Sequence, residues 1–311
     1  MRHLILQGAA RYGQRKALAS EGAGIKRRDE SPAATKYVTK MRFLITFAID
    51  AEFNPWKSRH PFVPYEYDNS GRKREFDMYR ANIGTHEVTV LLTGMGPSSA
   101  TRAMQIVPPE THGVWVSTGL AGALDSQLQR STIVAARRCV TQDASLQLSS
   151  DPDFINAAAQ CGATAVETFL TAETIITTSL EKESLASTAD VVEMESTHIL
   201  NAAQNRQIRA VAVRAISDTA EEDLPLDFQQ IADERGHVKV GGLLKELALH
   251  PYRLPLLIRF GRHSRAAAVA LADFLDRYLF ALAEEARRTT RNHDWAVSMA
   301  NAVSKKQGWL Q

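Results

Sequence analysis

The chain has 311 residues, of which 44% are hydrophobic and 23% charged, and it contains two cysteines. These values are ordinary for a globular protein whose core needs no disulfide, metal or cofactor. The net charge of +2 conceals a basic start, because residues 1–40 contain nine Lys or Arg against three acidic residues. The rest of the chain is mildly acidic, which argues against a nucleic-acid partner. We find no apolar run of about 20 residues and expect a soluble, cytoplasmic protein.

Residues 1–40 show neither helical nor strand periodicity and end directly before an apolar run at Met41. We interpret them as a disordered leader or as the result of a misassigned start site. A transit peptide is the alternative, but Asp29, Glu30 and Pro32 interrupt its basic composition.

From Met41 onward, short apolar runs alternate with stretches of helical periodicity. The runs predict strands, and the stretches between them predict helices. We expect strands at 43–48, 88–92, 114–117, 132–140, 165–170 and 208–216, and helices at 98–105, 152–160 and 195–204. This alternation predicts an α/β protein with helices on both faces of a sheet, and a ligand site among the loops at the strand ends.

The pattern after Phe228 is helical, with a break at Gly241-Gly242 and a long amphipathic helix at 268–286. We therefore expect one domain over residues 41–290, followed by a polar tail over 291–311. No internal repeat is visible.

Five segments at strand ends carry the residues that could perform chemistry. They are Ala48–Glu52, Thr93–Gly96, Ser117–Gly122, Val192–Ser196 and Val213–Ala220. Each segment alone is a weak signal, because a glycine pair after a strand is usually a tight turn. Glu-Met-Glu, at residues 193–195, is by itself usually only the start of a helix.

In this order and spacing, the five segments resemble the motifs of the nucleoside phosphorylase superfamily, and most of all those of 5'-methylthioadenosine/S-adenosylhomocysteine nucleosidases. The resemblance covers residues 41–228, and it is nearly letter for letter at Glu193-Met194-Glu195 and at Arg214-Ala-Ile-Ser-Asp218. It implies a three-layer α/β/α fold with a central mixed sheet, to which this chain adds a helical C-terminal extension. It also implies a homodimer that binds a small purine nucleoside.

The resemblance implies a catalytic role for three carboxyl groups. Asp218 corresponds to the acid that protonates purine N7, since desolvation at the end of an apolar strand favours the protonated form. Glu195 corresponds to the group that accepts hydrogen bonds from the ribose hydroxyls, and Glu52 to the base that activates water. Judged alone, Asp218 is more simply explained as a helix N-cap before Ala220.

The resemblance also implies a set of substrate-binding positions. Met194 packs against the sugar, Ile176 pairs with the adenine edge through its backbone, and Phe228 covers the 5' substituent. Ile175 occupies a place where many relatives have an aromatic ring, which puts base specificity in doubt. The remaining substrate-binding positions are Thr93, Gly94, Gly119 and Ser217.

We expect hydrolysis of a 5'-modified adenine nucleoside to free adenine, because Asp50-Ala51-Glu52 supplies a base and repels phosphate. Three alternatives remain open. In the first, residues 224–286 are similar to the C-terminal extension of hopanoid-associated phosphorylases. This similarity implies a lipid-linked adenosyl substrate, adenosylhopane, that is cleaved by hydrolysis or phosphorolysis at a membrane surface. Residues 253–265 would then lie beside the mouth of the pocket. The second is a non-catalytic nucleoside-binding module. The third, a Rossmann dinucleotide site, lacks the Gly-x-Gly-x-x-Gly motif after residues 43–48.

Overall fold

The computed structural model describes residues 40–65, 71, 75–108, 113–224 and 254–307, with side chains described as far as residue 288. Its strands are β1 (Arg42–Phe47), β2 (Val63–Pro64), β3 (Met78–Ile83), β4 (His86–Leu92), β5 (Val114–Ser117), β6 (Leu120–Ala123), β7 (Ile133–Thr141), β8 (Gln147–Ser149), β9 (Thr164–Thr171), β10 (Val191–Glu193) and β11 (Ala210–Asp218). Its helices are α1 (Asp50–Lys57), α2 (Pro97–Gln105), α3 (Pro152–Gln160), α4 (Ser179–Leu185), α5 (Ser196–Asn205) and α8 (Leu254–Gln307).

One mixed sheet of eleven strands forms the centre of this part of the chain, in the order β2-β3-β4-β1-β5-β11-β6-β10-β9-β7-β8. Strands β4, β1, β5 and β11 run parallel. They are mostly apolar and mostly buried, as at residues 43–47, because a parallel strand between two helical layers is covered on both faces. The expected mixed sheet is therefore confirmed.

Strand β11 connects the two halves of the sheet. It pairs with β5, and also with β6 in parallel and with β7 in antiparallel orientation. Because β6, β10, β9 and β7 also pair in succession, these four strands and β11 form a closed ring. All nine residues of β11 are buried, and the strand ends at Asp218.

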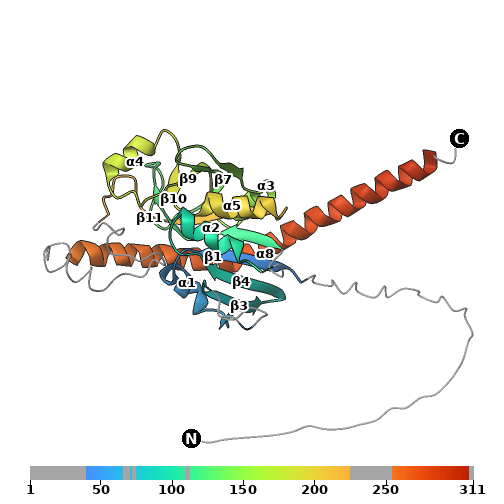
Figure 1. The fold of residues 1–311 in the computed structure, drawn as a ribbon, viewed down its shortest axis with the longest axis horizontal. Coiled ribbons are helices and arrows are strands. Elements are labelled where there is room, and N and C mark those ends of the chain that lie inside the picture. Colours follow the sequence, from blue (N-terminus) through green and yellow to red (C-terminus); the bar gives the residue numbers. More distant parts are fainter. Residues whose placement is uncertain (1–39, 66–70, 72–74, 109–112, 225–253, 308–311) are drawn as a thin grey trace, which may run out of the picture. The chain divides into compact units, whose positions relative to one another are not determined.

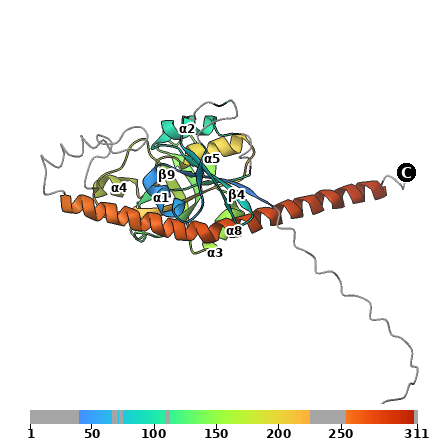
Figure 2. The ribbon, with the colours of Figure 1, turned by 90° about the horizontal axis from the view of Figure 1, so that it is seen from below.

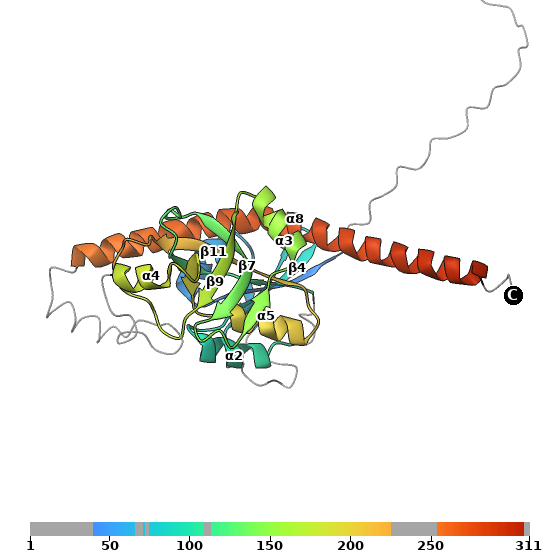
Figure 3. The same cartoon turned by 90° about the horizontal axis from the view of Figure 1, so that it is seen from above.

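Helices cover both faces of the sheet. Helices α2 and α5 pack together on one face, and α1 and α3 pack with α8 on the other. Figures 1, 2 and 3 show the strands between these two helical layers. The three-layer fold expected from the sequence is confirmed.

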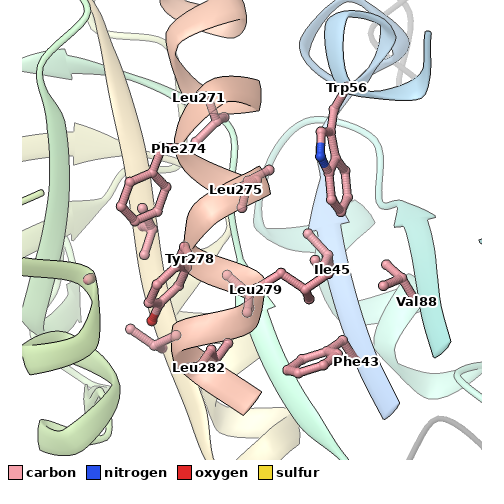
Figure 4. Close-up of a cluster of buried hydrophobic side chains, with 14 of the residues drawn as sticks. Phe43, Ile45, Trp56, Val88, Leu271, Phe274, Leu275, Tyr278, Leu279 and Leu282 are labelled. Carbon is pink, nitrogen blue, oxygen red and sulfur yellow. The ribbon is translucent and has the colours of Figure 1, made fainter. Parts of the chain in front are cut away.

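Helix α8 supplies a large part of the core beneath β1. Leu271, Phe274, Leu275, Leu279 and Leu282 are each at most 2% exposed and lie against the sheet (Figure 4). Burying one such side chain stabilises a fold by about 1.5–3 kcal/mol. The predicted amphipathic helix at 268–286 is therefore an integral part of this domain rather than a separate appendage.

Helix α8 extends in both directions beyond the predicted range. It begins at Leu254 and its backbone is helical to Gln307, so it includes most of the segment expected to be a polar tail. Pro255 lies in its first turn, where a proline costs no backbone hydrogen bond. None of the helices in the described ranges is long and apolar enough to cross a membrane.

Candidate active site

A cavity of about 1000 Å³ opens beside the ends of β1, β9, β10 and β11 and the start of β6. Its polar lining includes Glu52, Glu193, Glu195 and Asp218. Its apolar lining comes from two sources, the strand ends and helix α8. The cavity is large enough for a nucleoside with a substituent, since ligand pockets usually measure about 300–1,000 Å³.

Glu52 lies in the first turn of α1, not in a loop as the sequence suggested. One carboxylate oxygen accepts a hydrogen bond from the Ala48 amide at 2.9 Å, and the other accepts one from the Leu120 amide at 2.9 Å. Burial is the largest influence on this group and raises its pKa above the ordinary value of 4.5. Hydrogen bonds therefore fix the Glu52 carboxyl group at the cavity wall, and burial removes it from water. The raised pKa makes this group a better general base.

Gly119 makes room for this carboxyl group. A Cβ atom at residue 119 would lie 2.9 Å from Glu52 Oε2, and the backbone there has a φ of +146°, which other residues rarely adopt. The first and third of the five motif segments therefore meet at one point. This contact explains why a glycine is needed at position 119.

Glu195 precedes helix α5 and points toward the start of α2. Its Oε1 accepts a hydrogen bond from the Gly96 amide at 2.8 Å. Burial first, and the neighbouring charge of Glu193 second, raise the pKa of Glu195 to about 8. A group with this pKa can exchange protons near neutral pH, as residues in active sites often do.

Glu193 and Arg214 form a buried ion pair behind Glu195 that was not singled out from the sequence. Arg214 Nη2 lies 2.6 Å from Glu193 Oε2 but 3.6 Å from Glu195 Oε2. Glu193 Oε2 also accepts hydrogen bonds from the amides of Glu195 and Ser196, at 3.0 and 2.7 Å. The pair therefore fixes the backbone on which Glu195 stands.

Asp218 is the last residue of β11 and is 7% exposed. No helix follows it within residues 219–224, so the N-cap interpretation is wrong. Its Oδ2 accepts a hydrogen bond from Lys182 Nζ at 2.6 Å, and its Oδ1 accepts one from the Ser217 hydroxyl at 2.6 Å. Burial was expected, but the lysine beside this carboxyl group was not.

The remaining predicted positions divide into three groups. Ile175, Ile176, Met194 and Ser217 line the cavity. Thr93, Gly94 and Gly119 are not part of its lining, and the Thr93 hydroxyl donates to the Gly94 carbonyl oxygen instead. Phe228 lies outside the described residues.

Helix α8 contributes a wall that the motif segments did not indicate. Leu257, Phe260 and Val269 supply apolar surface, and Arg265 adds a charge. Part of residues 253–265, the segment expected beside the mouth of the pocket, therefore lines the cavity. Among the residues that the structure describes, no three His, Cys, Asp or Glu side chains gather as a metal site would require.

Known proteins with the same fold are found by two comparisons. A family model described as "Phosphorylase superfamily" matches residues 42–248. The 5'-methylthioadenosine/S-adenosyl homocysteine nucleosidase of Campylobacter jejuni is 17% identical, with a TM-score of 0.59 over 77% of this chain and 99% of that one. No curated protein matches the chain by sequence.

Two further solved structures have a similar fold. One is a 5'-methylthioadenosine/S-adenosylhomocysteine nucleosidase from Colwellia psychrerythraea in complex with adenine, 19% identical, with a TM-score of 0.59 over 78% of this chain and 96% of that one. The other is the futalosine hydrolase of Helicobacter pylori, 15% identical, with a TM-score of 0.55 over 76% of this chain and 97% of that one.

Proposed function

Because the chain belongs to the phosphorylase superfamily and shares its fold with solved nucleosidases, we propose that it hydrolyses the N-glycosidic bond of a 5'-modified adenine nucleoside. The observation that carries this proposal is that Glu52, Glu195 and Asp218 line one cavity. Each arrives from a different part of the chain, and each is at most 8% exposed. A binding module would have no need of a base for water.

The proposed reaction assigns one role to each carboxyl group. As the bond between ribose C1' and purine N9 breaks, its electron pair stays with the base, and Asp218 gives a proton to N7. Water attacks C1' and loses a proton to Glu52, whose raised pKa makes it a stronger base than an exposed glutamate. Glu195 accepts hydrogen bonds from the ribose hydroxyls and stabilises positive charge on the sugar. The products are free adenine and the 5'-modified ribose.

Hydrolysis is favoured over phosphorolysis by the charges around Glu52. The described arginines of the cavity wall are Arg59 and Arg265, and Arg59 is already paired with Asp273 at 2.5 Å and with Asp276 at 3.1 Å. Arg214, which lies behind the wall, is occupied by Glu193. A phosphate dianion beside Glu52 and Glu195 would be repelled by two carboxyl groups, and of the two wall arginines Arg265 on α8 is the one outside an ion pair among the described residues.

The test is to incubate the protein with methylthioadenosine, S-adenosylhomocysteine, adenosine and inosine, each with and without phosphate. Chromatography of the base and of the sugar then identifies the reaction. We expect free adenine and an unphosphorylated sugar at a rate that phosphate does not change. A sugar 1-phosphate formed only when phosphate is present would show a phosphorylase, and the absence of any free base would indicate a binding module.

A lipid-linked adenosyl substrate is a second candidate, favoured by the α8 wall. Leu257 and Phe260 line the cavity, and Leu256 and Ile258 beside them are 43% and 53% exposed. Arginines alternate with these apolar side chains along the helix, a mixture suited to an anionic lipid surface. A buried or partner-contacting helix with ordinary arginines would have the same composition.

Vesicle binding and substrate preference distinguish these explanations. A lipid substrate predicts binding to anionic vesicles that weakens with salt, and faster cleavage of a nucleoside with a long 5' alkyl chain than of methylthioadenosine. The variant Ile258→Ser should weaken both effects, whereas Val63→Ser, at a similarly exposed apolar site on β2, should weaken neither. Equal rates on both substrates and no vesicle binding would exclude the lipid candidate. Light scattering of the same preparation tests the predicted homodimer.

A further inference from the structure

We propose that Lys182 is a positioning residue that keeps Asp218 as an oriented carboxylate in the free protein, so that Asp218 takes up the proton it donates only when the purine binds. This inference rests on the proposed function in one respect, namely that Asp218 is the acid. It assigns a role to a side chain that lies outside the cavity lining.

Lys182 is fully buried, with 0% of its surface exposed. Its Nζ donates to Asp218 Oδ2 at 2.6 Å, to the Thr219 carbonyl oxygen at 2.7 Å and to the Glu222 carbonyl oxygen at 2.8 Å. An ammonium group has three hydrogens, and all three are used by these acceptors. Lys182 therefore has no donor left for a base or sugar, and its influence on a substrate must pass through Asp218.

Asp218 is held at both oxygens before any substrate arrives. Lys182 binds Oδ2, and the Ser217 hydroxyl binds Oδ1 while remaining 3.2 Å from the Ala121 carbonyl oxygen. Gly122 also packs closely against Oδ2, because a Cβ atom at residue 122 would lie 2.9 Å from this oxygen. These contacts fix the orientation of the Asp218 carboxylate. A catalytic group that is already oriented lowers the activation barrier of the reaction, because less entropy is lost in reaching the reactive geometry.

Stability alone does not explain a lysine at this place. Burying a charged pair costs about as much free energy of desolvation as the attraction returns, and apolar residues of similar volume are often as stable or more so. The same α4 residue could be a methionine or leucine packed against β11. A buried cation, by contrast, favours the ionised form of the carboxyl group it touches.

Several other charged groups lie near this pair. Asp223, on the segment after β11, faces Lys182, and its own pKa is lowered chiefly by a hydrogen bond from the Ser179 amide. Glu222 forms an ion pair with Arg130, which follows β6. Glu193 and Glu195 line the same cavity from β10 and the start of α5. None of these contacts an oxygen of Asp218, so Lys182 is the cation in direct contact with it.

The proton balance follows from this arrangement. In the free protein Asp218 is a carboxylate. On binding of the purine it takes one proton from solvent, and it then passes that proton to N7 as the bond to C1' breaks. Asp218 ends as a carboxylate beside Lys182, ready for the next cycle, while the proton that Glu52 removed from water returns to solvent.

The test compares the wild type with Lys182→Gln, whose amide can still donate to the two carbonyl oxygens but carries no charge. Protein labelled with ¹³C at the aspartate carboxyl carbons is titrated by NMR, and the Asp218 signal is identified by its loss in Asp218→Asn. We expect the midpoint for Asp218 to lie about one pH unit or more higher in Lys182→Gln, since a neighbouring opposite charge typically shifts a carboxyl group by one to three units. The pH profile of base release should shift in the same direction.

Arg130→Met is the matched control. Arg130 holds the same turn through Glu222 but does not touch Asp218. If the turn alone matters, Arg130→Met should shift the midpoint as much as Lys182→Gln does, and the proposal would be overturned. An unchanged midpoint in Lys182→Gln, with thermal unfolding showing a folded protein, would overturn it as well.

The NMR titration needs no turnover, so it separates this inference from the proposed function. A wild type that releases no adenine, together with a shifted midpoint in Lys182→Gln, would reject the function and leave the Lys182 contact as described. Adenine release by the wild type, together with an unchanged Asp218 midpoint in Lys182→Gln, would support the function and reject the proposed role of Lys182. A second variant, Lys182→Met, repeats the titration with a side chain that has no donor.

Discussion

Two parts of the cavity wall, which we call the Asp218 (or Lys182) end and the Glu195 end after the residues they contain, each place a buried cation near a buried carboxyl group, but the cations are arranged differently. At one end, Lys182 lies 2.6 Å from Asp218 and has no other acidic partner within hydrogen-bonding distance among the described residues. At the other, Arg214 lies 2.6 Å from Glu193 and 3.6 Å from Glu195. Glu193 takes the attraction of the arginine, and its negative charge then acts on Glu195.

This difference shows that the effect of a buried cation depends on which carboxyl group it contacts directly. A cation in direct contact with a carboxyl group favours the ionised form of that group. A cation that is occupied by a third group leaves the next carboxyl group desolvated beside a negative charge, which raises the pKa of Glu195 to about 8. Proximity to a positively charged residue is therefore not enough to predict the protonation state of a carboxyl group.

The largest expected effect comes from removing the acid at the Lys182 end. Asp218→Asn keeps the shape of the side chain but cannot give a full proton to N7, so kcat should fall by about 10²- to 10⁴-fold. Binding of the nucleoside, measured by calorimetry, should survive. Asp223→Asn is the control, because Asp223 is exposed, is not part of the cavity lining, and accepts hydrogen bonds from the Ser179 amide, at 2.7 Å, and from the Ser179 side chain. Asp218→Asn with kcat within a few-fold of wild type would show that Asp218 does not act as the acid.

The second effect concerns the arginine at the other end. Arg214→Met leaves Glu193 and Glu195 buried together without their cation, and breaking a buried pair in this way costs about 3–5 kcal/mol of unfolding free energy. Urea unfolding measures this loss. Arg209→Met is the matched control, since the Arg209 side chain is 30% exposed and pairs with Asp151 and Asp153 nearer the surface. Arg209→Met should lose about 1 kcal/mol of unfolding free energy or less. Equal losses in the two variants would mean that burial of the Arg214 pair has no special importance.

Much of the fold could be predicted from the sequence, because its signals are local. Residues 43–47, 114–117 and 210–216 are apolar runs that the sheet buries, and the periodicity of 268–286 belongs to one face of α8. Short elements were missed. Strand β10 has three residues, and the order of strands around β11 depends on pairing between distant segments.

The candidate site was predictable only where a residue lies in a recognisable segment. Glu52, Glu195 and Asp218 lie in such segments and line one cavity. Lys182 does not, since a lysine in a helix is normally exposed and only the tertiary structure brings it to Asp218. The one local signal near it is the capping box Thr178-x-x-Glu181, which marks the start of α4 but not the direction of the lysine.

The third effect is a dependence of stability on pH at the Glu195 end. The pKa of Glu195 is 4.5 ordinarily and about 8 in the folded protein, so between these values the folded state holds a proton that the unfolded state has lost. The stabilising contribution is complete below pH 4.5 and is lost as pH rises through 8. Glu195→Gln has no such proton, so its stability relative to wild type should rise with pH in this window, by at most about 1.4 kcal/mol per unit. Urea unfolding at pH 5, 6, 7 and 8 measures the slope, and a difference that stays constant over this range would contradict the raised pKa.

The smallest expected effect tests whether the purine lies beside Ile175. Ile175 lines the cavity and is half-buried, so its side chain can reach a ligand without being part of the core. If adenine lies beside it, Ile175→Phe should add a stacked aromatic face and tighten the binding of free adenine by about 0.5–1.5 kcal/mol. Binding of a ribose analogue without a base should not change. Ile258→Phe is a control, because Ile258 lies on α8, is exposed and does not line the cavity. If calorimetry shows that Ile175→Phe changes the binding of neither ligand, or of the ribose analogue alone, then the purine does not lie against the segment that contains Ile175.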